Sequence, residues 1–405
     1  MKNCMVAQSG GPTSVINASA IGIYKANKEF GYFDRVYAGI HGIEGILNEK
    51  LLNLSDIDEA TIDGLVYTPS SGFGSCRYKL KSFEDNKEEY LKLFEIFKKY
   101  EIDTFFYIGG NDSMDTVNKL SKYAAAENLS VKFFGIPKTI DNDLPFMDHT
   151  PGYGSAAKFI ATTALENKLD SNVYNTKNVF IIEAMGRDTG WLAASSCVAR
   201  INGQPVVDLI YLPEVPFNID EFVENVTDLL SRKNSVIVVV SEGIRTAEGK
   251  FLGEMNACGY DKFGHAQLGG VCGYLKSILK DKGVCKKIRT IELSTMQRCA
   301  MHLASQQDID EAFACGYEGL KYSQSGISGN MMSIQRVSEN PYKYKIVPIS
   351  TSKVANTIKY FPKEWINKDG NFVTDEAYKY VLPLIQGQSK VTYENGLPKY
   401  ELILK

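Results

Sequence analysis

The chain has 405 residues, of which 44% are hydrophobic and 23% are charged, and its formal net charge is −3. Because this length exceeds one ordinary hydrophobic core, we expect two domains. The slightly acidic balance argues against a nucleic-acid partner held by general electrostatics. A membrane partner is also not expected, because the longest clear apolar run, Val236–Val240, is far below the ~20 residues of a transmembrane helix.

Cysteine and histidine usage narrows the chemistry further. Eight cysteines are spread along the chain without a C-x-x-C pair, which argues against a zinc ribbon or a disulfide framework. We therefore expect reduced thiols in a cytoplasmic protein, and the N-terminal sequence "MKNCMVAQSGG" contains no apolar signal core. The four histidines form no H-E-x-x-H pattern, so the expected base of an enzyme is a carboxylate.

Short apolar strands alternate with amphipathic helices along the chain. Strands are expected at residues 3–8, 104–108, 131–136, 179–185 and 235–240, and helices at residues 14–28, 113–126 and 191–199. This alternation predicts an α/β fold with two Rossmann-like lobes, mainly parallel sheets and helices on both faces. An unusual polar loop follows each strand, with the sequences "SGGPTS", "GGNDS", "PKTIDND", "MGRDTG" and "SEG". Since ligands bind at the carboxyl ends of parallel strands, we expect the active site in the cleft between the lobes.

Two of these loops have the form of a phosphate cradle. In "SGGPTSVIN", residues 9–17, Gly10 and Gly11 can bring backbone N–H groups to an anion, and Thr13 or Ser14 can cap the following helix. A purely structural glycine turn is an equal alternative. The sequence "GGNDSMDT", residues 109–116, repeats the order of strand, two glycines and hydroxyl. Its Asp112 is unexpected there, because a carboxylate repels a phosphate.

The loop "PKTIDND", residues 137–143, places Lys138 and Thr139 close to Asp141 and Asp143. A simple turn would also explain its short polar side chains. A carboxylate near a lysine and a hydroxyl is a candidate general base. It can accept the proton of an alcohol that attacks phosphorus, while cations hold the phosphate charge.

Arginines occur in three further loops. "MGRDTGW" places Arg187 between glycines, where its guanidinium can fork to phosphate oxygens or pair with Asp188 as a structural bridge. Arg77 lies in "GSCR" and Arg298 lies in "STMQR", each of which alone fits a surface residue. Several basic residues on loops of one crevice indicate a ligand with more than one phosphate group.

Together these motifs resemble the phosphofructokinase family. The N-terminal glycine pair is followed, in the order and at the spacing of that family over about residues 4–345, by "GGNDS", "PKTIDND", "MGRDTG", "SEG" and "RTIELSTMQR". The combination of "TIDND" with "MGR" is highly specific. The resemblance implies a homodimer or homotetramer that transfers a phosphoryl group, with Mg²⁺, to the first-carbon hydroxyl of fructose 6-phosphate. This is a reversible step of glycolysis and gluconeogenesis that yields fructose 1,6-bisphosphate.

The resemblance also implies roles for the motif residues. Asp141 is the implied catalytic base, and the other implied catalytic residues are Asp112, Lys138 and Arg187. Contacts to fructose 6-phosphate are implied for Thr139, Ile140, Asp141, Met185, Gly186, Arg187, Glu242, Arg289, Thr295 and Arg298. Arg289 and Arg298 are the implied clamps of the 6-phosphate, and one of them can come from a neighbouring subunit. Contacts to the donor are implied for Gly11, Arg77, Asp112, Ser113 and Lys138. Contacts to Mg²⁺ are implied for Asn111 and Asp143.

The expected donor follows from Asp112 and Lys138. Family members that use ATP typically have glycine at both positions, so this pair resembles the diphosphate-dependent branch. A pair of unit charges at ~4 Å and an effective dielectric of ~20 is worth ~4 kcal/mol. Asp112 would therefore exclude the α-phosphate of ATP, while Lys138 would attract diphosphate and balance Asp112. The segment "FGHAQLGG", residues 263–270, also resembles one in diphosphate users.

Three positions depart from the family pattern. Asn111 stands where a metal-binding aspartate is usual, Thr295 where His or Tyr is usual, and Asn178 where many members have an arginine. Asn111 favours one alternative, a catalytically weak sugar-phosphate sensor, but a sensor needs no base such as Asp141. An ATP-dependent phosphofructokinase that tolerates Asp112 is the other alternative.

The domain boundaries follow from the same motifs. We assign residues 1–152 plus about 297–345 to a donor-binding lobe and residues 153–296 to a sugar-phosphate lobe. Residues 346–405 are rich in Lys and Tyr and have weaker periodicity. We expect this segment to be a C-terminal extension packed on the second lobe, with a plain surface segment as an equal alternative.

Overall fold

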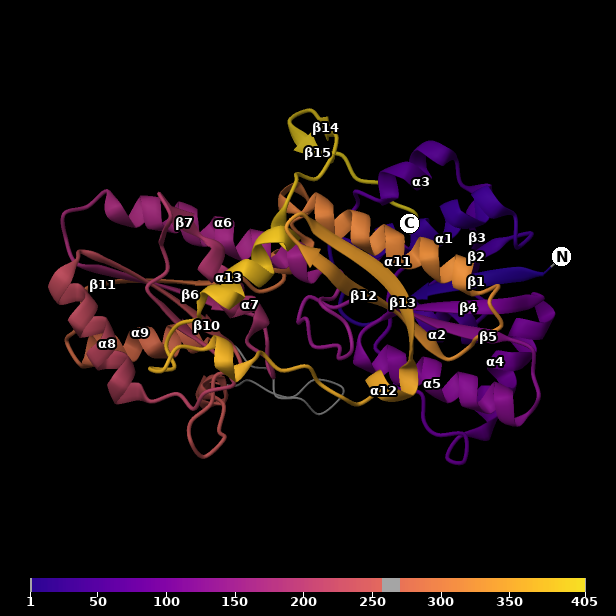
Figure 1. Ribbon diagram of the computed structural model, residues 1–405, viewed down its shortest axis with the longest axis horizontal. Helices are drawn as coiled ribbons and strands as arrows, with labels where there is room; N and C mark the ends of the chain where they lie inside the picture. Colours follow the sequence, from indigo (N-terminus) through magenta and orange to yellow (C-terminus); the bar gives the residue numbers. More distant parts are fainter. Residues whose placement is uncertain (1, 257–269, 405) are drawn as a thin grey trace. The chain divides into compact units, whose positions relative to one another are not determined.

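The computed structural model describes residues 2–256 and 270–404 (Figure 1). The chain divides into two compact units. Unit 1 comprises Met1–Ser155, Arg298–Ile358 and Gln386–Lys405, and unit 2 comprises Ala156–Gln297 and Lys359–Ile385. Each unit contains its own sheet with flanking helices, so the predicted α/β fold of two lobes with mainly parallel sheets is confirmed.

Unit 1 contains a seven-stranded sheet in the order β13-β12-β5-β4-β1-β2-β3. Its strands are β1 (Asn3–Gln8), β2 (Val36–Gly39), β3 (Leu51–Asn53), β4 (Ile102–Gly109), β5 (Lys132–Pro137), β12 (Asn330–Glu339) and β13 (Tyr342–Ser350). The five central strands are parallel, and β3 and β13 pair antiparallel at the edges. Gln8 pairs with Ile108, and Gly109 pairs with Pro137. The loops after β1, β4 and β5 therefore begin at one edge of the sheet.

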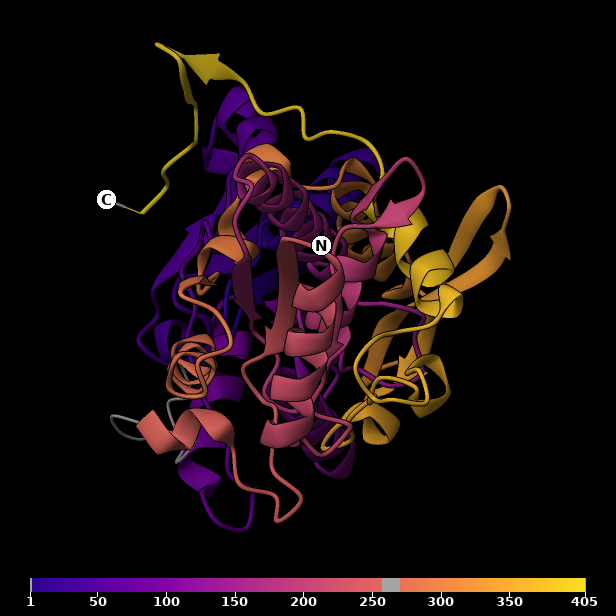
Figure 2. The same cartoon turned by 90° about the vertical axis from the view of Figure 1, so that its left-hand side faces the viewer.

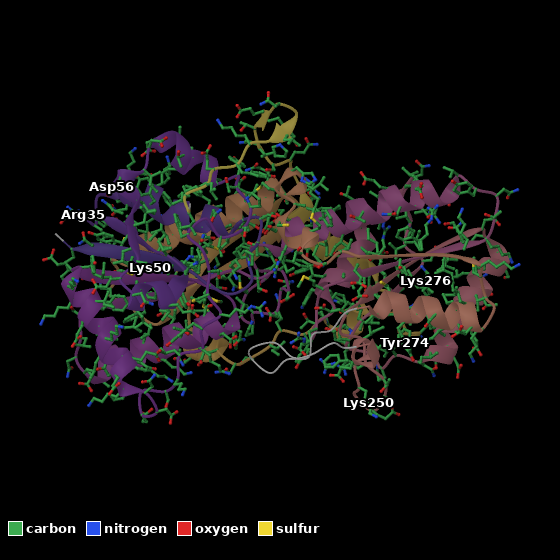
Figure 3. The ribbon with its side chains drawn as sticks, turned by 180° about the vertical axis from the view of Figure 1, so that it is seen from behind. Arg35, Lys50, Asp56, Lys250, Tyr274 and Lys276 are labelled. Carbon is green, nitrogen blue, oxygen red and sulfur yellow. The ribbon has the colours of Figure 1, made fainter. Side chains whose placement is uncertain are left out.

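Helices cover both faces of the unit 1 sheet. They are α1 (Ile16–Phe30), α2 (Gly42–Leu47), α3 (Glu59–Leu65), α4 (Lys87–Lys99), α5 (Asn111–Ala126) and α11 (Gln306–Tyr322). Successive side chains of a strand point to opposite faces. Cys4 and Val6 accordingly pack in one buried cluster with α1 and α11, whereas Met5 and Ala7 pack in another with α4 and α5. Charged side chains such as Arg35 and Lys50 lie exposed on this unit (Figure 3).

Unit 2 contains a four-stranded parallel sheet in the order β11-β6-β10-β9. Its strands are β6 (Asn178–Ala184), β9 (Leu209–Tyr211), β10 (Ser235–Ser241) and β11 (Lys287–Glu292). The near-continuous apolar run of β10 is fully buried, as expected for a central parallel strand. Its helices are most of α6 (Tyr153–Asn172), α7 (Trp191–Ser195), α8 (Ile219–Arg232) and α9 (Val271–Asp281). A short ribbon of β7 (Arg200–Ile201) and β8 (Gln204–Pro205) follows α7.

The C-terminal 60 residues differ from the prediction of one extension on the second lobe. Tyr342–Ser350 is the edge strand β13 of unit 1, because its alternating side chains pair along β12. Lys359–Ile385 lies in unit 2, where Phe361, Trp365 and Tyr380 pack on Trp191 of α7. The chain then returns to unit 1, where the hairpin of β14 (Tyr393–Glu394) and β15 (Leu397–Pro398) extends away from the sheet (yellow in Figures 1 and 2).

Smaller elements complete the two units. They are α10 (Met296–Cys299), α12 (Thr351–Val354) and α13 (Asp375–Val381), with 3-10 turns at Leu54–Asp56, Ser196–Val198, Leu252–Asn256, Met301–Leu303, Lys363–Trp365 and Leu382–Ile385. The predicted helix at 191–199 ends at Ser195 and continues as the 3-10 turn Ser196–Val198. Among the residues that the structure describes, no helix is both long and apolar enough to cross a membrane.

Candidate active site

Three loops meet at the carboxyl edge of the unit 1 sheet. They follow β1, β4 and β5, and they contain the two predicted phosphate cradles and the "PKTIDND" sequence. The buried hydroxyl of Ser9 donates to the carbonyl oxygen of Ile108 and contacts the hydroxyl of Ser113. A Cβ atom on Gly109 would lie 2.0 Å from the Ser113 Oγ, so glycine is required there. Ser113 thus binds the first two loops together from within and does not face outward.

Lys138 joins the third loop to the first. The residue is 3% exposed, and its ammonium donates hydrogen bonds to the carbonyl oxygens of Ser9 at 2.8 Å and Gly11 at 2.6 Å. The backbone N–H of Lys138 donates to Gly109, so the same residue is also bound to the second loop. A buried ammonium with carbonyl partners is well placed to add a positive charge to a ligand at this edge.

The charged groups that most affect Lys138 belong to the predicted site. Burial is the largest cause of its shift, and together with the guanidinium groups of Arg298 and Arg77 it lowers the pKa of Lys138 to about 7, although Asp141 and Asp143 act to raise it. Burial and the Arg77 charge likewise lower the pKa of Arg298. Three cations and two carboxylates therefore gather here. Asp112 is not among the charges with the largest effect on Lys138, so the expected balance between Asp112 and Lys138 stays a prediction.

The glycine pair lets the Lys138 and Arg298 side chains approach the backbone of the loop after β1. Gly10 has φ +73°, and a Cβ atom on it would lie 3.3 Å from the Lys138 Nζ. A Cβ atom on Gly11 would lie 3.0 Å from the Arg298 Nη1. The Gly10 N–H donates to the carbonyl oxygen of Cys76, so the expected anion contact falls to Gly11 and not to both glycines. Arg298, predicted as a clamp of the sugar phosphate, lies next to Gly11 of the donor loop.

The helix after the glycine pair begins later than expected. Helix α1 starts at Ile16, and its N-cap position, Val15, provides no side-chain cap. Thr13 instead accepts a hydrogen bond from the Val15 N–H, and the Ser14 hydroxyl donates to the carbonyl oxygen of Arg298. The prediction of a Ser14 cap was wrong, because this hydroxyl is used to hold a segment distant in sequence.

The predicted base is held in a closed loop. The Asp141 N–H donates to the Thr139 hydroxyl at 3.1 Å, and that hydroxyl lies 3.4 Å from the Asp141 Oδ2. Asn142 is fully buried at φ 56°, and its side-chain oxygen accepts a hydrogen bond from the Thr150 N–H. Ile140 is buried at 6% exposure. Asp141 and Asp143 are therefore presented on either side of a fixed asparagine.

Asn111 has a structural role that the sequence did not indicate. Its amide nitrogen donates to the carbonyl oxygens of Thr357 at 2.6 Å and Val354 at 3.4 Å, and its oxygen accepts from the Asn356 N–H at 2.6 Å. The Asn356 side chain donates to Asp115, one turn further along α5. Asn111 thus anchors the segment after α12 to the first turn of α5. The neighbouring Asp112 is exposed in that turn.

A second group of predicted residues lies in unit 2, at the ends of β6 and β10. The Gly186 N–H donates to Glu242, and the Met185 N–H donates to the side chain of Gln297. Gly186 has φ +121°, a conformation that favours glycine. The Ser241 hydroxyl donates to the Gly186 carbonyl oxygen. The loop that carries Arg187 is therefore held by its backbone.

The surroundings of Arg187 bear on its alternative role. Asp188 forms an ion pair with Arg245 at 2.6 Å, and Arg245 also donates to the carbonyl oxygen of Arg187. A Cβ atom on Gly243 would lie 1.9 Å from that same carbonyl oxygen. Asp188 thus fixes the loop through Arg245, which is a different arginine from the Arg187 of the structural alternative.

Arg289 is placed apart from the other predicted sugar contacts of its unit. It pairs with Asp170 near the beginning of β11, opposite Phe180 in the register, whereas Met185 follows the end of β6. Arg289 is the third residue of β11, whereas Thr295 lies three residues beyond its end, and a strand rises about 3.3 Å per residue. Thr295 is exposed after the strand. Within one chain, the structure does not bring Arg289 together with Thr295.

Unit 2 also contains a cluster of three side chains of the types that bind metal ions. The ligand atoms of Glu183, Cys272 and Glu292 lie within 4.8 Å of one another. The Glu183 carboxylate already accepts the Cys272 N–H at 2.9 Å, and burial raises the pKa of both side chains. None of the three is a predicted metal ligand, and a carboxyl that favours its neutral form is a poor one. The segment "FGHAQLGG" lies outside the described residues, except for Gly270.

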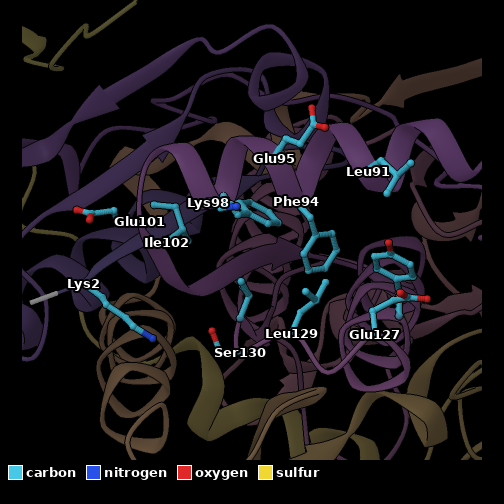
Figure 4. Close-up of a pocket in the computed structure, with 13 residues that line it drawn as sticks. Lys2, Leu91, Phe94, Glu95, Lys98, Glu101, Ile102, Glu127, Leu129 and Ser130 are labelled. Atoms are coloured by element: carbon cyan, nitrogen blue, oxygen red, sulfur yellow. The ribbon is translucent and has the colours of Figure 1, made fainter.

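A cavity of about 660 Å³ in unit 1 is separate from these loops (Figure 4). Leu91 and Phe94 of α4, Ile102 at the beginning of β4, and Leu129 after α5 contribute to its wall. Ile102 begins its strand, so this cavity lies at the amino edge of the sheet. None of the predicted site residues lines it.

Comparison with known proteins places the chain in a family. The sequence model described as Phosphofructokinase matches residues 3–319. The chain is 41% identical over 404 residues to a pyrophosphate–fructose 6-phosphate 1-phosphotransferase of Xanthomonas campestris, with coverage of 98% of this chain and 95% of the relative. It is 39% identical over 407 residues to a protein of the same name from Halomonas elongata, with coverage of 100% and 96%.

A solved structure agrees with these matches. The chain resembles a pyrophosphate-dependent phosphofructokinase of Nitrosospira multiformis with a TM-score of 0.89 and 37% identity, over 98% of this chain and 95% of that chain. The order and spacing of the loop motifs, the two α/β units and the full-length matches agree. The chain belongs to the phosphofructokinase family.

Proposed function

We propose that this protein is a diphosphate-dependent 6-phosphofructokinase. It transfers a phosphoryl group reversibly between diphosphate and the first-carbon hydroxyl of fructose 6-phosphate, giving fructose 1,6-bisphosphate and phosphate. The names of the full-length relatives at 39–41% identity support this reaction. The observation that carries the proposal is the buried Lys138 ammonium, bonded to Gly11 beside Asp141 and Arg298.

In the proposed reaction, the unit 1 group holds the donor. Lys138, Arg298 and Arg77 supply positive charge to the diphosphate, and the Gly11 backbone approaches it. Asp141 accepts the proton of the sugar hydroxyl as its oxygen attacks phosphorus, and phosphate leaves with the bridging oxygen. The closed loop around Asn142 fixes the direction of the Asp141 carboxylate, which favours a reactive geometry.

The unit 2 group is proposed to hold the sugar phosphate. Glu242 would accept a sugar hydroxyl, and the Met185–Arg187 loop would contact the ring and its phosphate. The hydrogen bond from the Gly186 N–H to Glu242 supports this assignment, because it links the two parts of the proposed sugar contact. Arg187 would add a forked contact to phosphate oxygens.

We infer a requirement for Mg²⁺, held by Asp143 and by the donor itself. Asp143 fits a hard cation, since it provides a carboxylate with a buried oxygen. Asn111 does not fit, because both polar atoms of its amide bond the Val354–Thr357 segment. One protein carboxylate with substrate phosphates is a common coordination of Mg²⁺. The bound ion would neutralise charge on the transferred phosphoryl group.

We further infer a homo-oligomer in the cytoplasm. Arg289 lies within β11, apart from Thr295 beyond its carboxyl end, which favours the expectation that it serves a neighbouring subunit. The seven described cysteines are free thiols, and this suits a reducing compartment. Size measurement in solution would test the first inference directly.

A coupled assay tests the proposed function. Purified protein with fructose 6-phosphate, Mg²⁺ and diphosphate should form fructose 1,6-bisphosphate. The reverse reaction should require inorganic phosphate and release diphosphate, which ³¹P NMR can follow. Product formed from ATP, with none from diphosphate, would contradict the proposal.

A further inference from the structure

The loop from Thr139 to Gly152, which carries Asp141 and Asp143, is held by hydrogen bonds at its two ends and by one within it. The Thr139 N–H donates to the carbonyl oxygen of Pro151 at 3.2 Å, and the Gly152 N–H donates to Asp308 at 2.8 Å. Within the loop, the Thr150 N–H donates to the Asn142 side chain at 3.0 Å. Any displacement of Thr150 therefore reaches the residue that separates the two carboxylates.

His149 precedes Thr150 and is completely buried between two carboxylates. Its Nδ1 lies 2.8 Å from the Asp148 Oδ2, and its Nε2 lies 2.6 Å from the Glu311 Oε2 of α11. An ionised carboxylate only accepts hydrogen bonds, so between two ionised carboxylates both ring nitrogens donate and the ring is an imidazolium. Burial opposes this charge, but Glu311 and Asp148 outweigh it and raise the pKa of His149 to about 9.

A second layer fixes both carboxylates. Arg336 of β12 donates to both oxygens of Asp148 at 3.0–3.2 Å, and the Tyr342 hydroxyl of β13 donates to Glu311 at 2.6 Å. Gln307 of α11 also donates to Glu311. Asp148 and Glu311 are balanced by Arg336 and the His149 imidazolium, so these four side chains carry no net charge together. Removing the imidazolium alone would leave one buried negative charge, which is costly.

Other titratable groups face this network from the same elements. Asp308 of α11 is fully buried, and burial raises its pKa to about 6. Tyr344 of β13 and Cys315 of α11 also interact with Glu311, and their pKa values are raised by burial. At pH 7 Asp308 is therefore mainly a carboxylate, whereas Tyr344 and Cys315 stay protonated and neutral. None of the three replaces His149 as the cation. Figure 1 shows α11, β12 and β13 side by side in unit 1.

We propose that His149 is a positioning residue for catalysis. Its imidazolium fastens the Thr139–Gly152 loop to α11 through Glu311, and it thereby sets the direction of Asp141 and Asp143 through Thr150 and Asn142. This inference rests on the proposed function for its kinetic consequence. His149 contacts no substrate, so its loss should lower kcat and leave substrate binding nearly intact.

The test is a double-mutant cycle of His149→Gln and Glu311→Gln, with His302→Gln as the control. His302 is exposed in the same unit. His149→Gln should lower kcat at least about tenfold, because a 1 Å displacement of a catalytic group can cost about 10²-fold. The KM values for diphosphate and fructose 6-phosphate should change less than about threefold. The double variant should recover about threefold or more in kcat, since the two side chains are coupled.

A spectroscopic measurement distinguishes this inference from the proposed function. In histidine-labelled wild-type protein, ¹⁵N NMR should show His149 with both ring nitrogens protonated at pH 7.5, and Glu311→Gln should lower the ring pKa. A neutral ring, or a His149→Gln kcat within twofold of wild type, would overturn the inference. If the wild type lacked activity with every donor, the proposed function would fail while the NMR result still tested the network. If His149→Gln fails to fold, Glu311→Gln alone must lower kcat.

Discussion

The Nζ atom of Lys138 lies 2.6 Å from the carbonyl oxygen of Gly11, so the loop after β5 is bonded to the glycine turn after β1. A second bond to Ser9 leaves this lysine buried. In the proposed function, the buried cation and the two arginines near it supply charge for a polyanion, and the Asp141 carboxylate supplies a base for an alcohol. This combination is what a phosphoryl transfer to a sugar hydroxyl requires.

Asp141→Asn tests the base. The amide keeps the size of the side chain but cannot accept the hydroxyl proton, so kcat should fall by about 10²–10⁴-fold. The KM for fructose 6-phosphate should change little. Asp56→Asn, an exposed change of the same charge (labelled in Figure 3), should leave kcat unaltered. Turnover near wild type in Asp141→Asn would falsify the assignment.

Lys138 predicts a pH dependence of diphosphate binding. Its pKa of about 7 lies below the usual value, so above pH 7 the free enzyme must take up a proton to present the cation. Affinity should therefore fall as pH rises through 7, by up to about tenfold per unit. In Lys138→Met this component should be absent. Isothermal titration calorimetry at pH 6.5 and 8.5 gives the dissociation constant for diphosphate of both proteins. Dividing one constant by the other at each pH cancels the effect of the protonation of diphosphate itself.

Proton uptake gives a second test of Lys138. The wild type should take up protons when it binds diphosphate above pH 7, and calorimetry in two buffers of different ionisation enthalpy detects this uptake. If wild type and Lys138→Met have parallel affinity profiles, then Lys138 does not contact the donor. The stability of the unliganded wild type should also rise with pH between about 7 and 10, because the unfolded lysine binds more protons there.

Gly11→Ala tests the close approach of Arg298. The added methyl group would lie 3.0 Å from the Arg298 Nη1, so the guanidinium must move. We expect the KM for diphosphate to rise about tenfold, equivalent to about 1.4 kcal/mol. The control is Gly273→Ala in α9, where a Cβ atom meets nothing within 4 Å. That change should stabilise the helix by up to about 1 kcal/mol without changing the KM. Equal KM values for both variants would remove Arg298 from the donor side.

Asn111→Asp tests the anchor of the Val354–Thr357 segment. A carboxylate would lose the donor to Thr357 and oppose its carbonyl oxygen, so the free energy of unfolding should fall by about 1–3 kcal/mol. Asn118→Asp on the same helix adds the same charge without this contact and should have a small effect. Denaturant unfolding measures both. Unchanged stability with tighter Mg²⁺ binding would instead return Asn111 to the metal site.

The strands and their loops could be predicted because the spacing of apolar residues, and the glycine and polar residues that end a strand, are local sequence signals. The polar loops after β1, β4 and β5 were expected at one edge, since carboxyl ends of parallel strands align, and the register of Gln8 with Ile108 confirms it. The position of the Arg298 guanidinium beside Gly11 could not be predicted, because the two residues belong to distant segments. The bonds of Asn111 go to backbone oxygens, which have no sequence signature.

His149 shows a second kind of limit. A single histidine in a loop carries no indication of the two carboxylates around it, since Glu311 comes from a distant helix. The sequence pattern of the C-terminal segment likewise did not predict that this segment is divided between the two units. An aromatic cluster is formed by Trp191, Phe361 and Tyr380. The sequence shows these residues but not their contact, because they are far apart along the chain.

The most direct test of the central claim is the ratio of kcat/KM for diphosphate and ATP, measured with fructose 6-phosphate and Mg²⁺ on one preparation. Asp112 is exposed, so its repulsion of a longer donor lies between the values for water and for the protein surface, about 1 to 4 kcal/mol at 4 Å. The ratio should therefore favour diphosphate at least about fivefold. Asp112→Gly should reduce this preference. A wild-type ratio that favours ATP would contradict the account.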